Sequence, residues 1–164
     1  MNEQELKKLV QNTVAAFRKE GREQVEMTDM TLDAAERVAN AVIAEAKRKG
    51  MRIVVCVSDA AGNPRLVKSM DDAYIASYDV AVNKAYTVVA LKMSTAQLKP
   101  LAQPNASLYG IQFTNGGKIV IFGGGDPLYA KNGKIVGGLG VSGGSEEEDT
   151  ALSAYGKHFF EQYM

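Results

Sequence analysis

The stretch 137–149, GGLGVSGGSEEED, contains the pattern G-x-G-x-x-G at Gly138, Gly140 and Gly143. In a dinucleotide-binding protein this pattern lies in a parallel βαβ unit, and an acidic residue follows about 20 residues later at the end of a second strand. Here the segment 144–164 is predicted to form a single helix, so the second strand is missing. The missing second strand argues against a dinucleotide site, so the glycines need another explanation.

Glycine is concentrated in this part of the chain. Eleven of the 16 glycines lie in the segment 116–144, whereas residues 1–109 contain three. Glycine weakens a strand because it has no side chain to pack and loses the most entropy on ordering. Two explanations stay open: a helix packs closely on the sheet beside hairpin turns, or a ligand meets the backbone at a flat or concave site.

The hydrophobic periodicity outside this stretch predicts alternating groups of helices and strands. Short turns join the strands, so neighbouring strands should pair antiparallel. The sequence thus predicts an α/β domain of the α+β type, with a five-stranded antiparallel sheet and helices packed on it. The expected helices are 3–20, 31–50, 73–93, 94–105 and 145–164, and the expected strands are 53–57, 64–70, 108–115, 118–122 and 135–143.

Charge and composition limit the classes of partner and the cellular location that the sequence allows. Nineteen basic and nineteen acidic residues cancel, so no net field attracts nucleic acid or an anionic membrane. No apolar run approaches the roughly 18 residues of a transmembrane helix. The first residues lack the apolar core of a secretory signal, and the single cysteine, Cys56, lies in an apolar run. The expected location is the cytoplasm.

Four blocks of the sequence resemble the GlcG/HbpS haem-binding-like family, which includes the C-terminal accessory domain of PduO-type corrinoid adenosyltransferases. The blocks are SDAAGN (58–63), MDDAYIASYDVAVNKAYT (70–87), LYGIQFTNGGKIVIFGGGDPLY (108–129) and GKIVGGLGVSGGSEEEDTALSAYG (133–156). The resemblance covers about residues 29–162. We therefore divide the chain into an N-terminal helical extension, 1–28, and a GlcG/HbpS-like domain, 29–164, that forms one globular unit.

The resemblance implies a profilin-like fold, homo-oligomers and two kinds of function. The first is a non-enzymatic protein that binds or senses a small ligand, such as haem or another tetrapyrrole, in cofactor-dependent carbon metabolism. The alternative is an oligomeric accessory or assembly protein without its own ligand, which supports a corrinoid-dependent diol or glycerol dehydratase and has a dehydratase or an adenosyltransferase as its partner. An enzymatic function ranks third, because no acid–base or nucleophile pair is visible in the sequence.

The motif positions of that family identify the expected ligand-binding residues. These are Asp79, Lys84, Tyr109, Asn115, Gly123, Gly124, Gly125 and Ser142. Free N–H groups in the glycine triplet would form a concavity for an anion. Alternatively, Asp79 and Lys84 satisfy backbone groups or pair with each other or with neighbours. Asp126 departs from the family pattern, and either faces a ligand or caps the loop.

Haem iron requires an axial donor, usually His, Met, Cys or Tyr. The only histidine, His158, is the candidate metal ligand, although a half-exposed position on a helix face would explain it equally well. Other possible donors are Met70, Met93, Tyr109 and Tyr129. The acidic run 146–149 is expected to be a solvated first helical turn, because consecutive carboxylates on a helix point in different directions.

Overall fold

The structure is a computed structural model and describes residue 4 and residues 26–163. The helix expected at 3–20 lies outside the described residues, apart from residue 4. The elements are α2 (Leu32–Arg48), β1 (Val54–Asp59), β2 (Pro64–Ser69), α3 (Ala76–Leu91), α4 (Thr95–Leu101), β3 (Gly125–Tyr129), β4 (Ile135–Ser142) and α5 (Glu146–Tyr163). None of the helices among these residues is long and apolar enough to cross a membrane.

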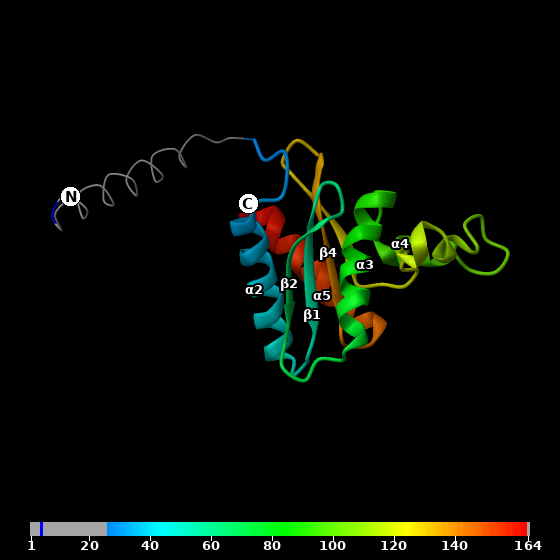
Figure 1. The fold of residues 1–164 in the computed structure, drawn as a ribbon, viewed down its shortest axis with the longest axis horizontal. Coiled ribbons are helices and arrows are strands. Elements are labelled where there is room, and N and C mark those ends of the chain that lie inside the picture. The colour runs from blue at the N-terminus through cyan, green and yellow to red at the C-terminus, as the bar shows by residue number, and fades with distance from the viewer. Residues whose placement is uncertain (1–3, 5–25, 164) are drawn as a thin grey trace.

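The strands form one antiparallel sheet in the order β2-β1-β4-β3. Figure 1 shows α2 and α3 on opposite sides of this sheet. Side chains alternate along the central strand β1: Val55 and Val57 join the core that contains α2 and α5, whereas Val54 and Cys56 pack against α3. Both faces of β1 are therefore buried, which explains why its sequence is an unbroken apolar run.

The prediction of five strands was wrong. The segment 108–118 consists of turns with two short 3₁₀ helices, Ile111–Phe113 and Asn115–Gly117, and 119–122 is irregular. Asn115, Gly116 and Gly117 all have positive φ angles (53°, 65° and 77°), which a pleated strand does not accommodate. The N–H of Val120 donates to Thr87 Oγ1 at 3.0 Å. A side chain of α3 therefore accepts the hydrogen bond that a neighbouring strand would otherwise accept.

The missed strand is β3, which pairs with β4 across the turn at 131–134. Its sequence, GDPLY, has a glycine and a proline and therefore lacks the usual composition of a strand. Proline is tolerated there because β3 lies at the edge of the sheet. The antiparallel α/β architecture itself is confirmed.

The glycines of β4 allow α3 to lie directly on the sheet. A Cβ atom at Gly138 would overlap the carbonyl oxygen of Ala85, and one at Gly140 would overlap the carbonyl oxygen of Ala81. The Gly140 Cβ would also lie 2.7 Å from the backbone nitrogen of Ala85. Close packing of helix against strand, the first of the two explanations above, therefore accounts for Gly138 and Gly140, whereas a Cβ at Gly143 would overlap the carbonyl oxygen of Arg52.

Candidate ligand-binding site

Lys84 and Asp149 form a buried ion pair between α3 and α5. The Lys84 side chain is wholly buried, and its Nζ donates to Asp149 Oδ2 at 3.0 Å and to the carbonyl oxygen of Val141 at 2.7 Å. Burial lowers the pKa of the Lys84 ammonium and raises the pKa of the Asp149 carboxyl, and the contact between the two groups opposes both shifts. Lys84 therefore pairs with a neighbour and a backbone group, one of the alternatives left open above.

The glycine triplet lies against this pair. Gly124 has a φ of 111°, and a Cβ there would come within 2.5 Å of Lys84 Nζ. The N–H of Gly123 donates to Glu146 Oε1 at 2.9 Å, and the N–H of Gly125 donates to Thr95 Oγ1 at 2.9 Å. The chain's own carboxylate thus occupies the place expected for an external anion, and these two N–H groups are not open to a ligand.

The carboxylate of Glu146 is itself held from α4. Lys99 Nζ lies 2.5 Å from Glu146 Oε2. This hydrogen bond, followed by the one from the N–H of Gly123, lowers the pKa of the Glu146 carboxyl. Glu146 therefore stays ionised and links α4 to the glycine triplet, so the first turn of α5 has a structural role in addition to its solvation.

The other predicted residues do not converge with Lys84. Ser142 is buried, and its Oγ hydrogen-bonds Ser77 Oγ at 3.0 Å. Asn115 is exposed, and its Nδ2 donates to the Tyr86 hydroxyl at 3.3 Å. Asp79 and Tyr109 are exposed as well. The expected ligand-binding residues thus divide into a buried cluster, a serine pair and separate surface positions.

Asp126 contacts α5. Its Oδ2 accepts a hydrogen bond from Ser153 Oγ at 2.6 Å. Burial raises the pKa of the Asp126 carboxyl, and the Ser153 hydrogen bond and the charge of Lys157 oppose this shift. Asp126 therefore links the edge strand β3 to α5.

His158 is exposed on α5, nine residues beyond Asp149 and therefore about 13 Å further along the helix axis. Among residues 4 and 26–163 no group of three or more His, Cys, Asp or Glu side chains is placed to hold a metal ion. His158 is thus separated from the buried cluster, and its role as an iron ligand stays a prediction.

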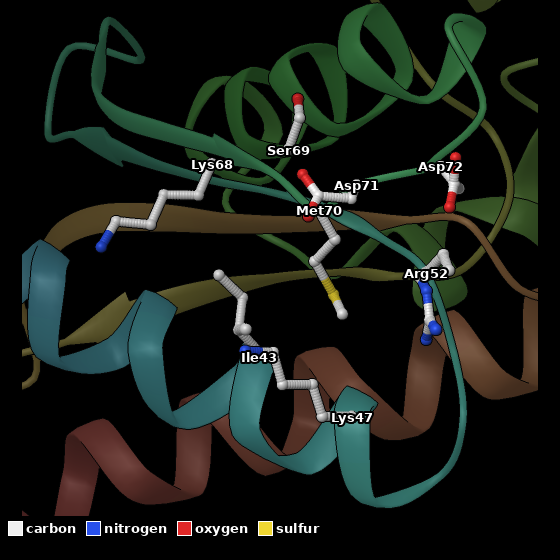
Figure 2. Close-up of a pocket in the computed structure, with 8 residues that line it drawn as sticks. All are labelled: Ile43, Lys47, Arg52, Lys68, Ser69, Met70, Asp71 and Asp72. Carbon is white, nitrogen blue, oxygen red and sulfur yellow. The ribbon is translucent and has the colours of Figure 1, made fainter.

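An open pocket of about 780 Å³ lies between α2 and the end of β2. Its lining residues are Ile43, Lys47, Arg52, Lys68, Ser69, Met70, Asp71 and Asp72. Figure 2 shows Met70 extending from the end of β2 toward α2 and Ile43. Both of these side chains are half-buried against the core, so the pocket combines an apolar floor with a charged rim. Sequence reasoning missed this site, apart from naming Met70 as a possible donor, because its residues come from separate segments.

Comparison with known proteins identifies the family. The profile of the family described as haem-degrading protein HbpS-like matches residues 30–157. The chain belongs to the HbpS-like family. A member in Citrobacter freundii, an uncharacterized 15.0 kDa protein of the dhaT–dhaS intergenic region, is 45% identical over 128 residues, which is 78% of this chain and 89% of that protein.

Two further similarities involve PduO. The corrinoid adenosyltransferase PduO of Salmonella typhimurium is 38% identical over 117 residues, and this HbpS-like chain matches 34% of its length. The crystal structure of a PduOC–haem complex superimposes with a TM-score of 0.76 at 34% identity, covering 80% of this chain and 94% of that one.

The lining of the pocket between α2 and β2 does not fit a haem. Haem needs a donor to iron, apolar contacts for both faces of the macrocycle and polar groups for its two propionates. Ile43 and Met70 are the apolar side chains of the lining, whereas its other six residues are charged or polar and include the carboxylates of Asp71 and Asp72. His158 does not line this pocket.

Proposed function

We propose that this chain is a non-enzymatic protein that binds or senses haem in the cytoplasm, within cofactor-dependent carbon metabolism. The observation that carries the proposal is the likeness of this chain to the PduOC chain solved with haem, at 34% identity and a TM-score of 0.76. Binding is favoured over catalysis because the most deeply buried charged groups, Lys84 and Asp149, contact each other and the backbone.

The second candidate is the accessory function without a ligand. It is supported by the Citrobacter freundii relative from the dhaT–dhaS region and by the likeness to part of an adenosyltransferase. In this proposal the partner is a diol or glycerol dehydratase or an adenosyltransferase. Capture of such a partner by a chain that does not bind haem would favour this candidate.

We also propose that the chain forms a homo-oligomer. Large apolar side chains are exposed at the beginning of α3 and in the segment between α4 and β3: Tyr74 is 73% exposed, Ile75 96% and Phe113 82%. Exposed apolar patches commonly mark protein interfaces. Static light scattering should therefore give a multiple of the 17.6 kDa chain mass. A monomer mass at every concentration would contradict this proposal.

Titration of the purified apo chain with hemin should give a saturable shift of the Soret band. Cobalamin, tested in parallel, should give no saturable change. His158→Ala, measured beside the natural chain, tests the histidine as the iron ligand: loss of the hemin shift would assign it that role, and a shift that is kept would exclude it. A stable band over time indicates binding, whereas a decaying band indicates breakdown of haem. If hemin produces no saturable shift, the haem-binding function is wrong, and a pull-down with dehydratase and adenosyltransferase components becomes the next test.

A further inference from the structure

We propose that the pocket between α2 and the end of β2 binds a small aliphatic zwitterion, a molecule with a carboxylate and an ammonium group at opposite ends of an apolar chain. Lys47 and Arg52, beside the end of α2, hold the carboxylate. Asp71 and Asp72, beside the end of β2, hold the ammonium group. This binding site is independent of haem, and it stands whether or not the chain binds haem.

The two kinds of charge in the pocket do not neutralise each other. In the part of the chain that the structure describes, no salt bridge within 4.0 Å involves the charged residues of the lining, which are Lys47, Arg52, Lys68, Asp71 and Asp72. Figure 2 shows Arg52 extending toward the end of α2 and away from Asp72. Opposite charges that line one pocket without pairing are complementary to a ligand that carries both charges.

The cations of the pocket keep donors for a carboxylate. Lys68 Nζ donates to Asn40 Oδ1 at 2.8 Å, so a neutral amide already engages this ammonium group. Arg52 Nη1 donates to the carbonyl oxygen of Met51 at 3.3 Å, and the other donors of its planar fork suit a carboxylate. Lys47 is exposed on the last turn of α2 and can turn toward the same group. Arg52 and Lys47 therefore form the cationic side of the pocket.

The acidic side of the pocket follows the end of β2. The backbone N–H of Met70 donates to the carbonyl oxygen of Ile53 at 2.9 Å, which extends the pairing between β2 and β1 by one residue beyond Ser69. Asp71 and Asp72 follow in an exposed turn. An ammonium group has three N–H donors and can therefore bind both carboxylates at once.

The apolar side chains of the lining lie between the two charged sides. Figure 2 shows Met70 extending from the end of β2 toward α2, with Ile43 and Lys47 on the side of α2. Met70 and Ile43 are half-buried against the core, so they offer a supported apolar surface. A chain of a few methylene groups needs one such surface, whereas a macrocycle needs apolar contact on both faces. The open pocket, of about 780 Å³, does not limit the length of the ligand, so the spacing of the charges sets it.

A titration of the isotope-labelled full chain, followed by its amide resonances, tests this site. In low salt, ε-aminocaproate should shift the resonances of residues around Arg52 and Met70 with a dissociation constant on the order of 1 mM, because exposed ion pairs are individually weak. Caproate lacks the ammonium group and hexylamine lacks the carboxylate, so each should bind about fivefold more weakly or worse. Glycine, whose two charges are too close together to reach both sides, should give no saturable shift.

Variants of each charged side have matched controls. Asp71→Asn combined with Asp72→Asn removes the acidic side, and asparagine tolerates the φ of 63° at position 72. This double variant should no longer distinguish ε-aminocaproate from caproate, whereas Arg52→Gln should weaken the binding of both by about fivefold. Asp33→Asn and Arg37→Gln change exposed residues of α2 outside the pocket, and should leave every affinity unchanged.

Three results would contradict this site. They are the absence of a saturable shift with ε-aminocaproate, equal affinities of ε-aminocaproate and caproate for the natural chain, and shifts confined to another part of the domain. Thermal melting verifies that each variant is folded. The hemin titration has its own readout in the Soret band, so failure of the zwitterion site leaves the haem-binding function standing.

Discussion

Asp149→Ala should lower the free energy of unfolding by about 3–5 kcal/mol, the usual effect of breaking a buried ion pair by removing one partner. The variant leaves the Lys84 ammonium wholly buried with only the carbonyl of Val141 as its remaining hydrogen-bond partner. It also removes the acceptor for the N–H of Gly144, which Asp149 Oδ1 binds at 2.9 Å. Urea denaturation followed by circular dichroism would measure the loss.

Glu147→Ala is the matched control for this prediction. Glu147 belongs to the same first turn of α5 and carries the same charge, but it is exposed. Its replacement should change stability by less than about 0.5 kcal/mol. The double variant Lys84→Met with Asp149→Ala should be more stable than Asp149→Ala alone, because it no longer buries an uncompensated charge. Equal effects of Asp149→Ala and Glu147→Ala would show that the pair does not stabilise the fold.

Gly140→Ala should destabilise the fold by about 3 kcal/mol or more, at the upper end of the cost of overpacking. The added methyl would overlap the carbonyl oxygen of Ala81 and lie 2.7 Å from the backbone nitrogen of Ala85. Both obstacles are backbone atoms of α3, so no side-chain rotation relieves the clash and the helix must move away from β4. The midpoint of urea unfolding should fall, while the slope of the unfolding free energy against urea concentration stays constant.

Gly133→Ala separates this steric effect from the general cost of replacing a glycine. Gly133 lies in the turn between β3 and β4 with a φ of 80°, and a Cβ there meets no atom within 4 Å. Its replacement should cost about 1–2 kcal/mol, from the left-handed backbone alone. If Gly140→Ala costs no more than Gly133→Ala, close packing of α3 on β4 is not the reason for the glycines.

The helices within residues 26–163 and the first hairpin could be predicted because their signals are local. Thr31 accepts a hydrogen bond from the N–H of Ala34 at the start of α2, and Ser145 does the same for Glu148 at the start of α5, as expected for capping residues. The error in the strands has a specific cause. The run at 118–122 is apolar because Ile119 and Val120 are buried, but the left-handed turn before it and the hydrogen bond from Val120 to Thr87 keep it out of the sheet.

The candidate site was less predictable. Lys84 lies beside Gly124 of the glycine triplet, whereas Asp79 and Asn115 of the same expected group lie apart on the surface. Lys84 pairs with Asp149, and Gly123 donates to Glu146, and both of these carboxylates belong to an acidic run that was expected to be solvated. No sequence motif indicated the pocket between α2 and β2. Its residues are contributed by α2, the residue before β1, and the end of β2 with the turn that follows it.

The sequence alone determined the family, through the four blocks that resemble it, and the antiparallel α/β architecture, because repeating side-chain patterns and capping residues act over a few neighbours. Tertiary structure decided which glycine-rich segment became a strand, which charges pair and where a pocket opens on the surface. Those outcomes depend on backbone atoms of α3 meeting β4 and on Lys84 reaching Asp149, 65 residues away in the chain. Contacts at such separation follow from packing geometry, which no local pattern specifies.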